Sequence, residues 1–298
     1  MTTTTLRRRE NREGITLISP AVIVVASIIV LPIIWTVVLS FQEARYVDVA
    51  RNGLFNTATL DNYIDTFTSP GFWRALQTTV VYSVATTVGS LVIGLVAALA
   101  FRERFRFRAP LRGAMLLPYV APVVATTFVW QVALNPQFGV VNAVGTELLG
   151  WDRPINFLTA APTALMTVIV FDTWRHFPFA FLFLSAALTG LSRDIEEAAV
   201  VDGASPVQKF RYVVLPQLMP TVALVALFRT VMAFNEFEGI FLLTGGAAGT
   251  QVASVRVYDQ LTGSSDIGSA SANAMVLAVI LGIGLMLYLR VMARRAES

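Results

Sequence analysis

Charged and hydrogen-bonding side chains interrupt two otherwise apolar stretches of this sequence. Residues 161–188 include Asp172, Arg175 and His176, and residues 219–243 include Arg229, Asn235, Glu236 and Glu238. Ionisable groups are costly in an apolar environment, so they usually face a water-filled cavity or a charged partner. Guanidinium, carboxylate and amide groups beside an aromatic ring are also the groups that bind a hydroxyl-rich solute. Both stretches are therefore candidates for a polar site.

The charges have two interpretations, and the sequence leaves both open. In the first, they neutralise one another: Asp172 and Arg175 are three residues apart and share a helix face. Arg229 and Glu236, seven residues apart, also share a face. In the second, they line a polar pathway for a solute, formed by Arg175, Phe179, Arg229, Asn235 and Glu236. We favour the second interpretation.

The composition predicts that these charges lie within a membrane. Of the 298 residues, 55% are hydrophobic and only 14% are charged, whereas a soluble protein carries about 25% charged residues. A membrane-spanning helix needs roughly 20 consecutive, mostly apolar residues. Such segments are Ile15–Phe41, Ala75–Phe101, Gly113–Leu134, Ala161–Leu188, Met219–Leu243 and Ala272–Met292. The fold class is therefore predicted to be all-α, a polytopic membrane protein with six transmembrane helices.

The positions of the arginines predict the orientation of these helices, because cytoplasmic loops carry an excess of Lys and Arg. One side would carry Arg7, Arg8, Arg9, Arg12, Arg102, Arg104, Arg106, Arg108, Arg112, Arg193, Lys209, Arg211, Arg290, Arg294 and Arg295. The other side would carry Arg45, Arg51, Arg74, Arg153 and Arg256. The bias of 15 to 5 places both termini in the cytoplasm. The first segment follows four of these arginines but is too long for a signal peptide, so we expect an uncleaved span.

The cytoplasmic loop 190–220 is predicted to form a helix, a turn and a second helix. Asp194 and Glu197 have the spacing of a capping box for the first helix, and Gly203 suits its C-terminal turn. Ser205 and Gln208 have the same spacing at the start of the second helix. Pro206 would occupy the first position of that helix, and Pro216 and Pro220 would end it. Two well-capped helices either dock against a partner or lie on the membrane surface.

This loop resembles a known family. The resemblance rests on Glu197-Ala198-Ala199, Asp202-Gly203-Ala204, Phe210, Leu215-Pro216 and Pro220, which are similar to the EAA loop of importer permeases of the ATP-binding-cassette (ABC) superfamily. It extends to Asn62-Tyr63, Phe72-Trp73-Arg74-Ala75-Leu76, Thr79, Leu117-Pro118, Trp130, Gly139, Asn142 and Leu243-Thr244-Gly245-Gly246. The chain therefore resembles, over most of its length, the first of the two permeases in carbohydrate importers of the maltose and glycerol-phosphate type.

The resemblance implies a type I importer permease fold in which the loop between the fourth and fifth spans supplies coupling helices to an ATPase. The residues it assigns to coupling are Glu196, Glu197, Ala198, Ala199, Asp202, Gly203, Ala204, Phe210 and Pro216. It adds Met232 to the residues of the substrate pathway, at a depth comparable to Arg175, Phe179 and Arg229. The implied partners are a second homologous permease, a cytoplasmic ATPase dimer and an extracytoplasmic solute-binding protein, in the cell membrane of a prokaryote. The implied solute is a sugar or a related polyol or glycerol phosphate.

Several activities are disfavoured by residues that the sequence lacks. The single lysine, Lys209, does not lie in a phosphate-binding loop, so ATP and Mg²⁺ would be used by the partner ATPase and this chain would bind no cofactor. With no cysteine and one histidine, a Cys- or His-rich metal site is not expected. We therefore expect a transport subunit rather than an enzyme. An alternative is a stand-alone secondary transporter with proton sites at Asp172, Glu236 or Glu238; an intramembrane enzyme is less favoured, because no catalytic pair is apparent.

The sequence predicts one membrane domain between two short tails. Residues 1–14 and 293–298 would be cytoplasmic tails, and residues 15–292 the permease domain with its EAA loop at 190–220. The arginine run 102–112 is expected to contact lipid headgroups rather than nucleic acid. Glycines within the spans are expected to allow close helix approach; they are Gly89, Gly94, Gly282 and Gly284.

Overall fold

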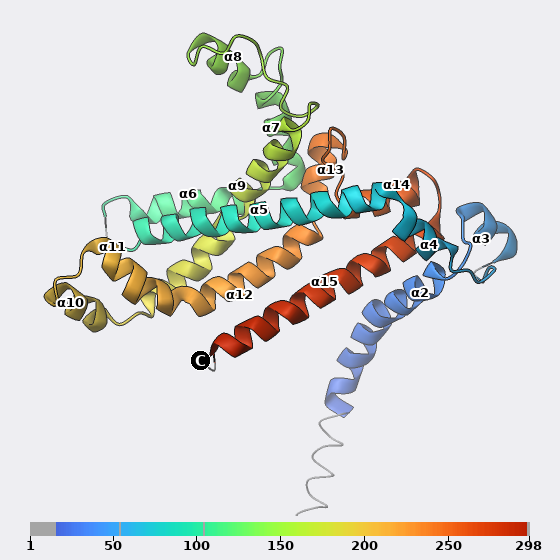
Figure 1. Cartoon of the computed structure of the whole chain (residues 1–298), viewed down its shortest axis with the longest axis horizontal. Coiled ribbons are helices and arrows are strands. Elements are labelled where there is room, and N and C mark those ends of the chain that lie inside the picture. The colour runs from blue at the N-terminus through green and yellow to red at the C-terminus, as the bar shows by residue number, and fades with distance from the viewer. Residues whose placement is uncertain (1–15, 54, 104, 297–298) are drawn as a thin grey trace, which may run out of the picture. The chain divides into compact units, whose positions relative to one another are not determined.

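Helices form nearly all of the regular structure in the computed structural model of the chain (Figure 1). The structure describes residues 16–53, 55–103 and 105–296, so Arg7, Arg8, Arg9, Arg12 and the predicted N-terminal tail lie outside it. The described residues contain isolated β-bridges but no strand. The prediction of an all-α chain is therefore confirmed for the part that the structure describes.

Among the described residues, four helices are long and apolar enough to cross a membrane, namely Thr16–Ser40, Pro70–Ala100, Pro206–Phe234 and Ile267–Arg294. A fifth span would result if α6 (Arg108–Val120) and α7 (Val123–Ala133) were counted as one broken helix. The helix α9 (Thr163–Thr189) has 27 residues, long enough for a bilayer, but it carries the ionisable residues described above. The chain is a helical protein with several membrane spans.

Two of the segments predicted to be single transmembrane helices are not continuous helices in the structure. The segment Gly113–Leu134 is not one helix, because α6 and α7 meet at an angle of 94°. Ala121 is extended there, and because it precedes Pro122 a steric clash disfavours helical geometry for it. The segment Met219–Leu243 ends early, at Phe234, and α13 (Glu238–Thr244) is a separate short helix.

The helix that ends at Phe234 also begins earlier than predicted, at Pro206 rather than at Met219. It runs without a break through α11 (Pro206–Lys209), the π-helical η2 (Phe210–Val214) and α12 (Leu215–Phe234), 29 residues in all. The prediction that Pro216 and Pro220 end a helix was therefore wrong. Both prolines lie within the first two turns of α12, and the π-helical segment directly before α12 has already departed from the regular hydrogen-bond pattern that proline would interrupt.

The chain divides into two compact units. The first consists of residues 1–69 and 257–279 and contains α2 (Leu31–Ser40), α3 (Tyr46–Asn52) and α4 (Asp61–Thr68), with η1 (Ala26–Val30) before them. Asn62 holds the segments of this unit together. The buried side-chain amide of Asn62 donates to the carbonyls of Ser40 at 3.0 Å and Gln42 at 2.9 Å. The start of α15 (Ile267–Ala296) joins the same centre through a bond from the Gly268 amide to the Ala44 carbonyl at 3.0 Å.

The second unit consists of residues 70–256 and 280–298 and is built around three long helices. In it α5 (Pro70–Ala100), α9 and α12 pack against one another, α6 packs on α9, and α13 packs on α7 and α9 (Figure 1). Its remaining helices are α8 (Val140–Glu147), α10 (Arg193–Val201) and the start of α14 (Ala253–Thr262). Aromatic and leucine side chains such as Phe177, Phe181, Leu184 and Leu218 fill the core between these helices.

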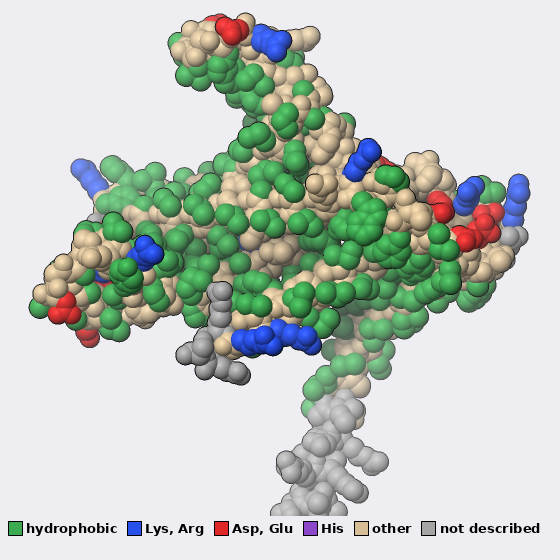
Figure 2. Space-filling view, in the orientation of Figure 1, with side chains coloured by type: hydrophobic (Ala, Val, Ile, Leu, Met, Phe, Trp, Pro, Cys, Tyr) green, Lys and Arg blue, Asp and Glu red, His purple; other side chains and the backbone are tan. Residues whose placement is uncertain are grey.

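The polarity of α5 is reversed relative to a helix on the surface of a soluble protein, because its polar side chains are buried and its apolar side chains are exposed. Its buried face holds hydroxyl-bearing and small side chains, namely Thr79, Tyr82, Ser83, Thr86, Thr87, Ser90, Gly94, Ala97 and Ala98. Its exposed face is a row of valines, at Val80, Val84, Val88, Val92 and Val96. Figure 2 shows hydrophobic side chains over much of the exposed surface of the long helices, with charges gathered near the ends of the elements. Exposed apolar surface of this extent indicates a bilayer as the surrounding solvent.

Close helix approach explains the glycines of α5. A Cβ at Gly94 would lie 2.6 Å from the Cβ of Ala180 and 2.8 Å from the amide nitrogen of Phe181, both in α9. A Cβ at Gly89 would lie 2.9 Å from the Thr173 side chain. The prediction is therefore confirmed for these two positions. Within the part of the chain that the structure describes, Gly282 and Gly284 have no heavy atom within 4 Å of the Cβ position, so for them the prediction stays untested.

Candidate functional site

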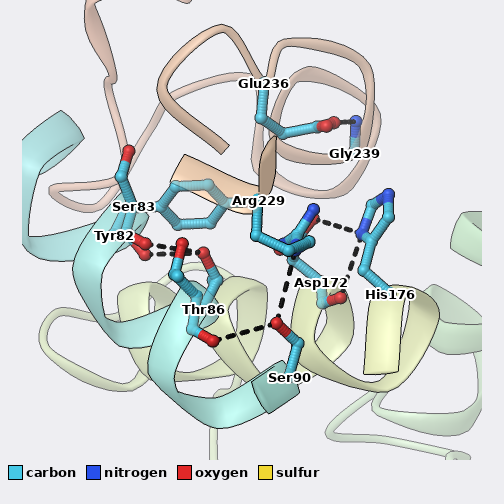
Figure 3. A network of polar contacts seen from close by, with 10 residues as sticks. Tyr82, Ser83, Thr86, Ser90, Asp172, His176, Arg229, Glu236 and Gly239 are labelled. Atoms are coloured by element: carbon cyan, nitrogen blue, oxygen red, sulfur yellow. Dashed lines mark hydrogen bonds and ion pairs between the residues drawn. The ribbon is translucent and has the colours of Figure 1, made fainter. Parts of the chain in front are cut away.

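The centre of the second unit contains a buried ion pair between two helices. Arg229 in α12 is 0% exposed, and its Nη2 donates to Oδ2 of Asp172 in α9 at 2.6 Å. Its Nε donates to the hydroxyl of Ser90 in α5 at 3.3 Å. Figure 3 shows the guanidinium turned toward both partners. One arginine therefore ties three helices together.

His176 completes this cluster from the next turn of α9. Its Nδ1 lies 2.8 Å from Oδ1 of Asp172 and 3.1 Å from the Asp172 backbone carbonyl (Figure 3). The Asp172 carboxylate thus contacts Arg229 with one oxygen and His176 with the other. All three side chains are buried, so the cluster is a structural tie in this conformation.

Both of the pairings proposed from the sequence were wrong. Asp172 pairs with Arg229 and His176 rather than with Arg175, because α12 brings a guanidinium from another helix to the carboxylate. Glu236 forms no ion pair with an arginine among the described residues; its Oε1 accepts from the Gly239 amide at 2.8 Å. The physical reason is that α12 ends at Phe234, so Glu236 no longer continues the helix face that carries Arg229. The spacing of i and i+4 between Asp172 and His176 was the one signal available from sequence.

The residues predicted for the substrate pathway fall into separate environments. Arg229 is fully buried, which leaves no accessible surface for a solute in this conformation. Arg175 and Phe179, four residues apart on α9, are half-buried, and the buried Arg175 Nε has no hydrogen-bond partner in the part of the chain that the structure describes. Met232 and Asn235 lie exposed at the end of α12, where the Asn235 amide donates to the Val231 carbonyl at 2.8 Å.

A second polar cluster lies where α10 approaches the end of α5. Glu196 is buried, and both of its carboxylate oxygens accept from the Arg102 guanidinium, with Nη1 at 2.9 Å from Oε2. The Lys209 Nζ lies 3.7 Å from the same Oε2. The hydrogen bonds from Arg102, together with the nearby positive charges, hold the pKa of Glu196 below its ordinary value of 4.5. Arg102 and Glu196 are 94 residues apart, so no local sequence pattern indicates this contact.

The other residues predicted for coupling divide by exposure. Glu197, Ala198, Asp202, Gly203 and Pro216 are exposed, Ala199 and Ala204 are half-buried, and Phe210 packs against the core of the second unit. Gly203 has φ of +81° and forms the turn after α10, as predicted. A groove of about 420 Å³ follows this region and is lined by Arg102, Glu103, Glu196, Glu197, Val200, Val201 and Lys209. The acidic and apolar groups of α10 thus form an exposed surface.

One of the two predicted capping boxes is confirmed. The Gln208 amide donates to the Ser205 hydroxyl at 3.3 Å, and the Ser205 amide donates to the Gln208 side chain at 2.8 Å, with Pro206 at the start of the helix. The box between Asp194 and Glu197 was wrong, because α10 begins two residues earlier than that box requires, with Ser192 rather than Asp194 at the N-cap. Asp194 is therefore inside the helix, where its side chain is not in the capping position.

The Arg102–Glu196 contact makes the attachment of α10 sensitive to acid. Because the pKa of Glu196 is lowered in the folded state, its stabilising contribution is fully present above pH 4.5 and is lost as the pH falls through the lowered value. We expect proteolysis of the 190–205 segment to accelerate in acid in the unmodified chain. E196Q should be cleaved rapidly even at neutral pH, whereas E197Q, changed at an exposed neighbour, should behave as the unmodified chain. Slow cleavage of E196Q at neutral pH would contradict this role.

The fold and these sites define a polytopic helical membrane protein with internal polar clusters and an exposed acidic loop. The chain belongs to the family of binding-protein-dependent transport system inner membrane components, whose model matches residues 90–297. It is thus the permease component of such a transport system, a membrane translocation subunit rather than an enzyme.

Relatives with assigned names support this membership. The chain is 31% identical over 266 residues, 89% of either protein, to the inner membrane ABC transporter permease protein YcjO of Escherichia coli K12. It is 30% identical to the trehalose/maltose transport system permease protein MalF of Thermococcus litoralis, covering 97% of this chain and 96% of that protein.

A solved structure shares the fold. A chain of a bacterial ABC transporter involved in the import of the acidic polysaccharide alginate superposes with a TM-score of 0.82 at 22% identity, over 98% of this chain and 100% of that chain. The likeness covers both units of the chain. It shows that this chain has the same overall fold as that importer chain.

Proposed function

We propose that this chain forms, with a second homologous permease, the translocation pathway for a sugar or a related polyol in an ATP-driven importer. The observation that carries the proposal is its match to the binding-protein-dependent family over residues 90–297. The solute class is supported by relatives named for trehalose and maltose, for trehalose, and for sulfoquinovosyl glycerol. Family membership gives no support to a stand-alone secondary transporter.

The remaining partners follow from the same membership. A structural neighbour was solved in complex with a periplasmic protein that holds an alginate pentasaccharide. We infer that a solute-binding protein likewise delivers the solute to this chain from outside the cell. A separate ATPase dimer, which binds ATP and Mg²⁺, would power the cycle from the cytoplasm.

The proposed membrane domain is residues 15–292, with the loop 190–220 and both tails, residues 1–14 and 293–298, in the cytoplasm. Six spans result when α9 is added to the four apolar helices and the broken pair α6–α7. Pairing of Asp172 with Arg229 and His176 supports this placement of α9, because neutralised charges are tolerated at membrane depth.

The proposed coupling site has an outer and an inner part. Exposure of Glu197, Ala198, Asp202 and Gly203 supports their docking into the ATPase, beside the exposed valines Val200 and Val201. Glu196 belongs to the inner part, where it holds α10 against Arg102, and Phe210 anchors the second helix in the core. Ala199 and Ala204 keep the surface between these parts narrow, and the exposed Pro216 lies where the loop enters α12.

The proposed pathway residues are Arg175, Phe179, Met232, Asn235 and Glu236, with Arg229 as a positioning residue. The unpartnered Nε of Arg175 supports a donor role toward solute hydroxyls, and Phe179 on the same face offers a ring for stacking.

The experiment is ATP-driven uptake of labelled disaccharides by the complete transporter in proteoliposomes. R175Q is expected to lower uptake about tenfold, because one charged hydrogen-bond donor is lost, while ATPase activity stays coupled to the binding protein. R153Q, which changes an exposed arginine of another loop, is the matched control. Unchanged uptake by R175Q would assign that arginine to packing, and absence of any ATP-driven uptake would refute the proposed function.

A further inference from the structure

A small cationic pocket lies at the end of α5 where α6 and α9 converge. Its volume is about 140 Å³, and its walls carry three arginines and two hydroxyl groups among apolar side chains. The lining residues are Ala98, Phe101, Arg102, Arg108, Arg112, Ser185, Leu188, Thr189 and Leu191, and no carboxylate is among them. A water needs about 10–15 Å³ of such space, so the pocket has room for an ion several times larger.

The arginines of the pocket are not all neutralised. Both Nη atoms of Arg102 donate hydrogen bonds to the Glu196 carboxylate, as described above. Arg108 and Arg112, one helical turn apart on α6, form no ion pair with any carboxylate of the described residues. The Arg112 guanidinium lies 5.5 Å from the centre of the Phe181 ring, a contact that leaves its N–H donors free for an anion. Two half-buried guanidinium groups therefore share one pocket without a counter-charge.

Unsatisfied hydrogen-bonding atoms accompany this excess of charge. The Ser185 hydroxyl and the Arg108 Nε are both buried without a hydrogen-bond partner among the described residues. Ser185 is 6% exposed and is one of the residues that line the pocket. Leaving such atoms unpaired is costly, and a bound acceptor would satisfy both. The second hydroxyl, of Thr189, is already used, since it donates to the Ala186 carbonyl.

The ligand that this arrangement fits is a compact anion with several acceptor oxygens. The planar guanidinium of arginine can donate two parallel hydrogen bonds to the oxygens of a phosphate, and a serine hydroxyl adds a further donor. Phe107 and Leu111, on either side of Arg108, are 60% and 47% exposed and provide apolar surface beside the arginines. We propose that this pocket binds a phosphate group, supplied either by an anionic lipid headgroup or by a free phosphate ion.

The test uses the full-length chain, purified in neutral detergent and freed of lipid. In one arm, mixed micelles containing phosphatidylglycerol are added and the retained lipid is quantified by mass spectrometry. In the other arm, the thermal unfolding midpoint is measured in inorganic phosphate and in chloride at equal ionic strength. R108Q and R112Q should weaken binding about tenfold each, because each removes a charged donor. S185A should weaken it by a smaller factor and is not expected to disturb folding.

R106Q is the matched control, because Arg106 belongs to the same arginine run, is exposed and does not line the pocket. Retention of phosphatidylglycerol that is lost in R108Q but not in R106Q would establish a lipid headgroup as the source. A rise in the midpoint with phosphate that disappears in R108Q would establish the free ion. If neither probe distinguishes R108Q and R112Q from R106Q, the pocket is not a phosphate site. Neither readout involves transport, so the result is independent of the proposed solute.

Discussion

Replacing Asp172 with alanine is expected to prevent most of the protein from folding in the membrane. The change would leave the Arg229 guanidinium, which is 0% exposed, without its carboxylate partner at 2.6 Å. Removing one member of a buried ion pair costs about 3–5 kcal/mol, because the remaining charge stays desolvated. This is a large part of the 5–15 kcal/mol that stabilises a typical native protein. His176 would lose its carboxylate partner in the same step and keep only the backbone carbonyl of residue 172.

The measurement is the amount of monodisperse protein recovered from membranes by size-exclusion chromatography, followed by its thermal midpoint. D152A, which removes an exposed carboxylate outside the cluster, should match the unmodified chain. The double variant D172A/R229M should recover much of the lost protein, since it removes both charges together. Normal recovery of D172A alone would show that the ion pair contributes little to stability.

Charge reversal at Glu197 is expected to abolish ATP-driven transport while leaving the protein in the membrane. Glu197 is exposed on α10, so lysine there fits the fold without burying a charge. In the proposed docking it would meet the basic groups of the ATPase with the wrong sign. Juxtaposed like charges cost several kcal/mol at an interface, enough to weaken docking at least about 100-fold.

Two measurements separate docking from folding in E197K. Capture of the ATPase subunit by the tagged permease should be lost, and uptake into proteoliposomes should fall with it. E147K makes the same charge change at an exposed position at the end of α8, and we expect it to dock and transport normally. Normal uptake by E197K would remove Glu197 from the coupling site.

The local features of this fold could be predicted from the sequence alone. Long apolar runs predicted the helices Thr16–Ser40 and α9 to within a few residues, since each run needs only the bilayer to be stable. The Ser205–Gln208 capping box and the positive φ of Gly203 were also predicted, because both depend on neighbouring residues alone.

The contacts between helices were not predictable in the same way. Asp172 and Arg229 are 57 residues apart, and hydrophobic periodicity does not show which helix faces which. The local pairing of Asp172 with Arg175 was therefore the natural expectation, and tertiary packing overrode it. The bend before Pro122 did have a signal, in the proline itself, but the continuous apolar run concealed it. The capping prediction at Asp194 failed because the N-cap of α10 is Ser192, two residues earlier than the pattern indicated.

The uninterrupted helix from Pro206 to Phe234 has a mechanical consequence. At 1.5 Å per residue its 29 residues form a rod about 43 Å long, with the turn at Gly203 just before one end and Arg229 near the other. No break in the helix separates the loop from the span. If the loop end of this helix moves, the end that carries Arg229 therefore moves with it, and the ion pair with Asp172 is displaced. The π-helical turn at Phe210–Val214 lies within this rod without interrupting it, so the loop and the span are expected to move as one body.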